Sequence, residues 1–281
     1  MASKMSPEQV AELAAAIAGA GAAPGDLGAL VRGLRAAGPS AFTGDEIDSI
    51  AGAVAALEQP LEVKAAWAAA KNRGLFFVFE GLDRSGKSTQ SKRLTKYLEE
   101  TGPVKWMCFP NRVTAVGTLI DLYLQNKIEL SDETVHRLFS ANRWEMVQSI
   151  IADLNAGTSI VCDRYAFSGV AYSAAKGLDL EWCQAPDRGL PCPDAVFFLH
   201  IDASVGASRA NFGDERYENA TMQARVRTEF KAERLRAKVN WNDVDGARDM
   251  EVIHAEIRAV AEGLREADKE NPRQMAKLWL E

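Results

Sequence analysis

The sequence predicts an α/β protein, with a parallel sheet of five strands flanked by helices and a small all-α segment in front of it. Three observations predict this class. Short apolar runs alternate with helical patterns after residue 73, a glycine-rich turn joins the first of these runs to a helix, and 22 of the first 73 residues are alanine. Alternation of strands and helices favours a parallel sheet with helices on both faces.

Composition excludes several classes of protein. The 281 residues are 47% hydrophobic and 26% charged, which is enough apolar material for a sizeable core and rules out wholesale disorder. A net charge of −6, without a basic tail, argues against a nucleic-acid partner. The four cysteines include no CxxC pair and are expected to be reduced thiols inside the cell. We therefore expect a cytoplasmic protein without a membrane segment, and a nuclear or organellar location stays open.

Residues 1–73 are expected to form an Ala-rich helical extension, separate from a second domain over 74–281. Helix signals recur through it, and the N-cap candidates are Ser6, Asp26 and Thr43. Pro60 is expected to end the third helix, and a fourth is predicted over 61–71. The segment carries no catalytic pattern. Its role as a stabilising appendage, a docking site for an unknown protein partner or a targeting segment stays open.

The second domain holds the predicted sheet. Strands are expected over 75–79, 104–109, 159–162 and 195–201, with a weaker fifth over 239–244. The first of these runs is apolar throughout, as in a strand that is buried on both faces. The longest helical pattern runs from about 132 to 155.

Residues 81–89 match the phosphate-loop pattern G-x-x-x-x-G-K-[ST], directly after an apolar strand and before an amphipathic helix. Glycines let backbone N–H groups curl around phosphate oxygens, and the helix that follows adds the positive end of its dipole. Lys87 is expected to reach the β- and γ-phosphates, and the Ser88 hydroxyl to ligate Mg²⁺. The expected phosphate-binding residues are Gly81, Arg84, Ser85, Gly86, Lys87, Ser88 and Thr89.

Five blocks carry a family resemblance. They cover residues 79–90, 109–112, 139–145, 163–172 and 212–218. With these blocks in this order, residues 74–281 resemble the thymidylate kinase family in its eukaryotic-like form, while 1–73 have no counterpart. The resemblance implies the P-loop nucleoside-monophosphate-kinase fold, a homodimer, and Mg²⁺-dependent transfer of a phosphoryl group from ATP to dTMP.

The resemblance also implies roles around the transferred group. Arg84 would stabilise the transferring phosphoryl group, and Asp83 would accept a hydrogen bond from the deoxyribose 3′-OH. Asp163, at the end of the third strand, would hold Mg²⁺ directly or through water, and Arg164 would touch the acceptor phosphate. A mobile lid would carry Arg216 to the phosphates, whereas Arg209 is expected to be a solvated charge. The loop over 244–248 would lie around adenine.

For the acceptor nucleotide, we expect an Arg112 fork on the monophosphate, because ligands bind at strand ends in open α/β sheets. Phe139 and Arg143 lie four residues apart on a helix and share one face, so a base stacked on the ring could receive a hydrogen bond at thymine O4. The resemblance implies that Tyr172 lies near the sugar C2′, where its ring would clash with a ribose 2′-OH. The expected acceptor residues are Asp83, Phe109, Arg112, Phe139, Arg143, Arg164, Gly169 and Tyr172.

Two departures from the family pattern are modest: Asn111 stands where an acidic residue is commoner, and Ser85 where alanine is frequent. Two alternatives remain at this stage. One is a kinase for another nucleoside monophosphate, such as dUMP, UMP or CMP. The other is a catalytically inactive nucleotide-binding scaffold that recruits a partner through its extension.

Overall fold

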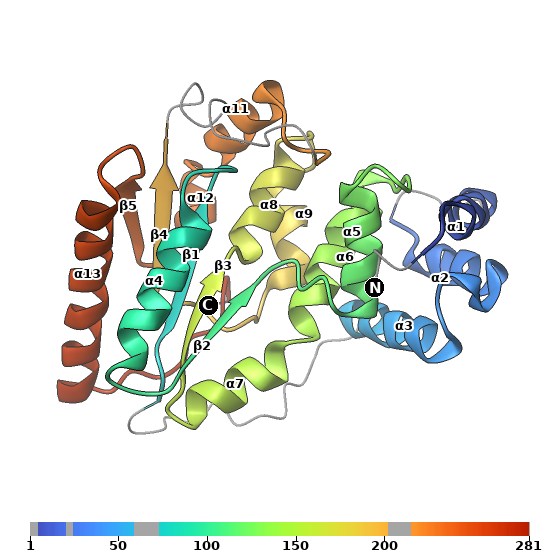
Figure 1. Cartoon of the computed structure of the whole chain (residues 1–281). Coiled ribbons are helices and arrows are strands. Elements are labelled where there is room, and N and C mark those ends of the chain that lie inside the picture. Colours follow the sequence, from blue (N-terminus) through green and yellow to red (C-terminus); the bar gives the residue numbers. More distant parts are fainter. Residues whose placement is uncertain (1–4, 21–24, 59–72, 202–214, 281) are drawn as a thin grey trace.

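A five-stranded parallel sheet in the order β2-β3-β1-β4-β5 forms the centre of the computed structural model (Figure 1). The structure describes residues 5–20, 25–58, 73–201 and 215–280. The predicted fold class is confirmed, and the five strands lie within two residues of their predicted bounds. They are β1 Phe76–Gly81, β2 Val104–Cys108, β3 Ser159–Asp163, β4 Ala195–His200 and β5 Trp241–Asp245.

Both faces of the central strand β1 are buried under helices, which explains its unbroken apolar run. Phe77 and Phe79 pack with α4 (Lys87–Glu99) and α13 (Met250–Glu270). Phe76 and Val78 point to the opposite face, where they join a cluster with residues of α7 (Val147–Asn155) and α8 (Ala166–Ala174). The sheet is therefore the middle layer of a three-layer α/β/α domain.

The helical pattern predicted over 132–155 is present, but it is not one continuous helix. It is divided into α6 (Asp132–Trp144) and α7. At the division, the N–H of Met146 bonds to the carbonyl of Arg143, three residues back, at 3.0 Å. The Glu145 carboxylate next to it accepts a bond from Thr114 at 2.9 Å. This contact with a distant segment could not be read from helical periodicity.

The other helices of this part of the chain are α5 Ala115–Leu124, α9 Leu180–Gln184, α11 Ala220–Glu229 and α12 Glu233–Arg236, with a 3₁₀ turn, η3, over Ala185–Asp187. Across the described ranges, no helix combines the length and the apolar character that a membrane crossing requires.

Three of the predicted extension helices are present, namely α1 (Pro7–Gly19), α2 (Leu27–Ala36) and α3 (Gly44–Glu58). Their predicted caps are confirmed. The Ser6 hydroxyl accepts from the Gln9 N–H at 3.2 Å, the Asp26 carboxylate accepts from the Ala29 N–H at 2.8 Å, and the Thr43 hydroxyl accepts from the Glu46 N–H at 3.3 Å. Pro60 and the fourth helix predicted over 61–71 lie outside the described residues.

The extension shares a hydrophobic core with α5 and α6, against which it lies at the far end of the molecule from α13 (Figure 1). Ile50 and Val54 of α3 are buried there with Leu119 of α5 and Leu138 of α6. The same two helices line the candidate site described below. Division of the chain into two domains near 71–74 therefore stays a prediction.

Truncation of Ile50 tests this shared core. Its side chain is fully buried, so Ile50→Ala should lower the free energy of unfolding by about 2–4 kcal/mol. Urea denaturation followed by circular dichroism measures the change. Ser49→Ala, at an exposed position of the same helix, should change it by less than about 0.5 kcal/mol. Equal effects of the two variants would show that α3 is not packed on the second domain.

Candidate active site

The glycine-rich turn after β1 lies at the N-terminus of α4. Gly81 and Gly86 have φ angles of 139° and 99°, in the left-handed region that favours glycine. A Cβ on Gly81 would also lie 2.2 Å from the carbonyl oxygen of Leu199 on the neighbouring strand. Gly86 is the N-cap of α4, so the unpaired N–H groups of the first helical turn open onto this loop. Such a turn is suited to binding an anion.

Lys87 begins α4 and is buried, with 4% of its surface exposed. Its ammonium group donates to the carbonyl of Leu82, and it lies 3.4 Å from the Ser85 hydroxyl. Burial lowers the pKa of Lys87 to about 8, and the positive charge of Arg164 acts in the same direction. Only part of this effect is offset by the carboxylates of Asp83 and Asp163.

Asp163, at the carboxyl end of β3, accepts a hydrogen bond from the Ser88 hydroxyl through Oδ2. Its other oxygen, Oδ1, is buried and has no hydrogen-bond partner among the described residues. An unpaired buried carboxylate oxygen next to a hydroxyl, beside an anion-binding turn, fits a divalent cation with oxygen ligands.

Arg164 follows Asp163 with a φ of 67°, which is rare for a residue with a side chain. The carboxylate of Glu80 holds the chain in this turn, because it accepts from the N–H groups of Tyr165 at 2.9 Å and Ser168 at 3.0 Å. Glu80 is fully buried, and burial raises its pKa above the ordinary value. The Arg164 guanidinium bonds to the Gly81 carbonyl at 3.1 Å, which ties the end of β3 to the phosphate loop.

Asp83 is the centre of a polar network between the loop and two helices. It pairs with Arg164 and accepts hydrogen bonds from the Tyr172 hydroxyl at 2.9 Å and the Gln223 amide at 2.6 Å. Although burial disfavours its charge, Arg164 and Lys87 hold the pKa of Asp83 below the ordinary value. Asp83 is therefore a carboxylate at neutral pH.

Two further arginines each form an ion pair with a carboxylate of the segment before α11. The Nη2 atom of Arg112, after β2, lies 2.8 Å from Oε1 of Glu215 in this segment, and its Nη1 lies 2.5 Å from Oδ1 of Asp121 in α5. Arg84, inside the phosphate loop, lies 3.3 Å from Glu218. These pairs have exposed fractions of 13–39% per side chain, so solvent screens them and they can exchange for another anion.

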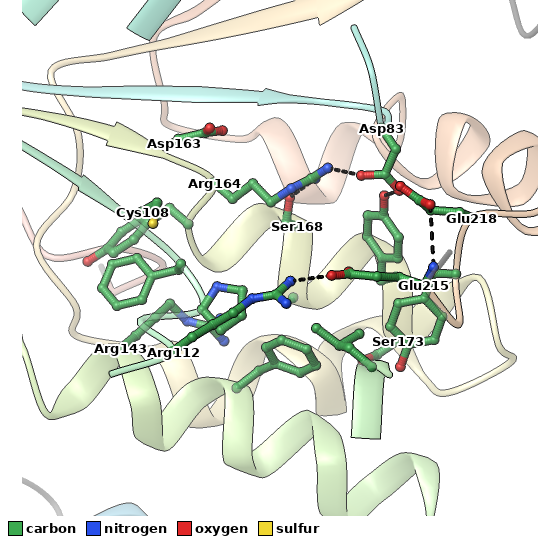
Figure 2. A pocket seen from close by; sticks show the side chains of 18 residues that line it. Asp83, Cys108, Arg112, Arg143, Asp163, Arg164, Ser168, Ser173, Glu215 and Glu218 are labelled. Carbon is green, nitrogen blue, oxygen red and sulfur yellow. Dashed lines mark hydrogen bonds and ion pairs between the residues drawn. The ribbon is translucent and has the colours of Figure 1, made fainter. Parts of the chain in front are cut away.

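A cavity of about 250 Å³ opens between the ends of β1, β2 and β3 and the helices α6 and α8. Figure 2 shows Arg112 pointing toward Glu215 and Arg164 toward Asp83 within it. Its walls are aromatic or apolar over most of their surface and include Phe109, Phe139, Arg143, Gly169 and Tyr172. Such a mixture of flat apolar walls with a few charged groups is typical of a small-molecule site.

Arg143 is the most buried of the charged residues that line this cavity, with 1% of its surface exposed. It pairs with Asp187, with Nε to Oδ1 at 3.0 Å and Nη2 to Oδ2 at 2.5 Å, and both side chains are almost fully buried. Gly169 of α8 lies against the guanidinium, since a Cβ at this position would be 2.9 Å from Nη2. The predicted proximity of Phe139 and Arg143 holds, because both side chains line the cavity.

A family model described as thymidylate kinase matches residues 79–257, more than half of the chain. The chain belongs to the thymidylate kinase family. Its curated relatives in this family include the thymidylate kinases of Danio rerio and Homo sapiens. They are 44% identical over 209 residues and 43% identical over 212 residues. These alignments cover 74% and 75% of this chain, and 98% and 99% of the two relatives.

A solved thymidylate kinase, from Candida albicans, is similar in structure. Its TM-score is 0.65 at 36% sequence identity, and the match covers 73% of this chain and 98% of the other. These three thymidylate kinases thus match about three quarters of this chain over nearly their own whole length. The P-loop nucleoside-monophosphate-kinase fold predicted from the sequence agrees with this likeness.

Most residues that the sequence predicts for a thymidylate kinase site are brought together, and Arg216 is not among them. Its guanidinium pairs with Glu129 at 2.7 Å and stacks 4.0 Å from the centre of the Tyr123 ring. It does not line the described cavity. Arg209 and the core of the predicted lid, over 211–213, lie outside the described residues.

Sequence reasoning missed five polar residues of this site. They are Glu80, Asp187, Glu215, Gln223 and Glu218. One signal was present for Glu80, which is a charge inside an otherwise apolar strand. No sequence signal marks Asp187 or Gln223, since their partners lie 44 and 140 residues away.

The titration of Lys87 tests the described geometry of this loop. In the protein alone we expect its ammonium to lose the proton at about pH 8, because burial favours the neutral form. An anion in the loop favours the charged form, so saturating pyrophosphate should raise the pKa, and pyrophosphate affinity should fall as pH rises above 8. NMR of lysine Cε resonances, assigned with Lys87→Met, measures both. A Lys87 pKa near 10.5 without pyrophosphate would contradict the burial described.

Proposed function

We propose that this protein transfers the γ-phosphoryl group of ATP to dTMP, which yields ADP and dTDP. The observation that carries the proposal is the position of the aromatic cavity directly beside the phosphate loop, with Arg164 bonded to both Asp83 and Gly81 between them. Membership of the thymidylate kinase family supports the same reaction. Two nucleotides bound end to end would place their phosphates at this junction.

On the donor side, residues 81–89 would hold the ATP phosphates. Backbone N–H groups of the loop and of α4, together with Lys87 and Arg84, supply the positive charge. Ser88 and Asp163 would hold Mg²⁺, and the unpaired Oδ1 of Asp163 supports this assignment. Bound Mg²⁺ would neutralise charge on the phosphate oxygens. The remaining donor residues in this proposal are Gly81, Ser85, Gly86 and Thr89.

On the acceptor side, Arg112 would hold the dTMP phosphate as a two-pronged donor in exchange for Glu215. Phe139 would stack on thymine, with Arg143 as donor to O4, while Phe109 and Gly169 complete the walls. The Tyr172 ring, fixed by its bond to Asp83, would exclude a 2′-OH. Asp83 would accept from the 3′-OH.

The chemical step needs no strong general base. The second pKa of a phosphate monoester is about 6, so the acceptor is largely ionised at pH 7. An oxygen of the dTMP phosphate bonds to the γ-phosphorus as the bond from that phosphorus to the ADP oxygen breaks. Lys87, Arg84 and Arg164 would stabilise the charge on the transferring group. Arg216 would join them only after it leaves Glu129.

Other features implied by the resemblance remain proposals. A homodimer would use a face other than the α5 and α6 surface that the extension covers. We expect action in the cytoplasm, with a nuclear or organellar location as the alternative. Nucleotides are the expected partners, without nucleic acid or membrane. An unknown protein partner of residues 1–73 stays open.

A panel of acceptors tests the proposed reaction. Purified protein with ATP and Mg²⁺ should phosphorylate dTMP with a kcat/KM at least about tenfold above those for UMP, CMP and AMP, because a 2′-OH or a misplaced donor costs about 1–3 kcal/mol. dUMP is included in the panel as a deoxynucleotide that is closely related to dTMP. A coupled assay of ADP release measures turnover. Activity with UMP or AMP but not with dTMP would overturn the assignment of dTMP as the substrate. No turnover with any acceptor would indicate an inactive scaffold.

Removal of the Arg112 fork tests the acceptor site. Arg112→Ala should lower kcat/KM for dTMP several hundred-fold, about 3–4 kcal/mol, because the charge that positions the acceptor phosphate is lost. Steady-state kinetics at saturating ATP measures it. Arg32→Ala, which removes an exposed arginine of the extension, is the matched control and should leave turnover unchanged. Wild-type turnover of Arg112→Ala would contradict the site.

A further inference from the structure

The ion pair of Arg143 and Asp187 is the most deeply buried pair at the site, with 2% and 0% of the two side chains exposed. A pair in this position is costly to desolvate and adds little stability by itself. Its contact is bidentate, with both carboxylate oxygens engaged. This geometry fixes the rotation of the guanidinium as well as its charge.

Asp187 is itself held from two sides. The Ser140 hydroxyl lies 2.7 Å from Asp187 Oδ1, to which it donates. The carbonyl of Pro186, the residue before Asp187, accepts from the Ser140 hydroxyl at 3.1 Å and from the Trp144 indole N–H at 2.7 Å. Ser140 and Trp144 lie on α6, as Arg143 does. These hydrogen bonds therefore fix the turn η3 to α6, the helix that carries Arg143, and they hold the Asp187 carboxylate in one position.

The guanidinium has five N–H groups, and Asp187 accepts from one on Nε and one on Nη2. Both N–H groups of Nη1 and the second N–H of Nη2 remain. Gly169 covers one face, where a Cβ would be 2.9 Å from Nη2 and 3.0 Å from Nη1. Within the described part of the chain, Nη1 has no hydrogen-bond partner, and Arg143 lines the cavity. A guanidinium N–H can only donate, so a ligand atom that meets Nη1 has to be an acceptor.

We propose that Asp187 is a specificity-determining positioning residue, which holds Arg143 so that Nη1 selects an acceptor atom at position 4 of a pyrimidine. A thymine or uracil carbonyl oxygen satisfies Nη1. The amino group of cytosine places two donors against each other and leaves both unpaired, which is the kind of mismatch that discriminates most strongly. The inference rests on the proposed function and adds the residue that sets its choice of base.

Asp187→Asn is the direct test. The amide keeps the shape of the side chain but opposes an N–H₂ to one guanidinium nitrogen, so the fork has to rotate. We expect KM for dTMP to rise at least about tenfold, kcat and KM for ATP to change less than about threefold, and the ratio of kcat/KM for dTMP over dCMP to fall at least about tenfold. Asp153→Asn, in an exposed ion pair with Lys105, is the matched control and should change none of these values.

Two further variants separate positioning from a general structural role. In an Arg143→Met background, Asp187→Asn should cause no further fall in the dTMP-to-dCMP ratio, because the residue acts through Arg143. Gly169→Ala should lower the ratio without touching Asp187, since its methyl group displaces the guanidinium. Thermal unfolding monitored by circular dichroism shows whether Asp187→Asn folds. If it does not fold, Gly169→Ala provides the test.

An unchanged ratio in folded Asp187→Asn would overturn the inference. An equal fall in the Arg143→Met background would do the same. Failure of the wild-type protein to phosphorylate dTMP would instead overturn the proposed function. The two failures are therefore distinguishable in one set of assays.

Discussion

Charge compensation at the carboxyl edge of the sheet is the constraint on which the rest of the site depends. Lys87 and Arg143 are buried there, and Arg164 is partly buried, with 19% of its side chain exposed. An unpaired charge in the interior is costly relative to the net stability of a domain. Asp187 compensates Arg143, and Asp83 compensates Arg164. Two of the three cations are thus held in place by carboxylates of the protein itself, while Lys87 donates to the carbonyl of Leu82.

The backbone around these charges is bent to bring them together. A left-handed residue at Arg164 reverses the chain after β3, and the buried carboxylate of Glu80 on β1 holds the turn. The same arginine then bonds back to Gly81 of the phosphate loop. One polar network therefore joins two adjacent strands with the anion-binding turn, which leaves little freedom in the distance between a donor phosphate and the acceptor cavity.

Local patterns in the sequence predict the parts of this structure that local physics determines. Strand β1 and the turn after it follow from an apolar run and from glycines whose backbone conformations few other residues adopt. The caps of α1 to α3 follow from side chains that bond within three residues of their own position. The helical pattern over 132–155 did not reveal the break between α6 and α7, where Glu145 accepts a hydrogen bond from Thr114, 31 residues away.

Buried carboxylates were missed for the same physical reason. The role of a residue such as Asp187 depends on a partner that is distant in the sequence and that only folding brings close. Composition and periodicity do not reveal that partner. The position of Arg216 on Glu129 is likewise a long-range ion pair that the sequence does not reveal. The proximity of Phe139 and Arg143 could be predicted from the sequence, because one turn of helix separates them.

A crystal structure with adenosine and thymidine joined through a chain of phosphates between their 5′ oxygens tests the central claim most directly. We expect the adenosine-side phosphates on residues 81–89 and thymine between Phe139 and Arg143. Arg112 should bind the thymidine-side phosphate instead of Glu215. An analogue bound away from the phosphate loop, or bound there with Arg112 still on Glu215 and Asp121, would contradict it.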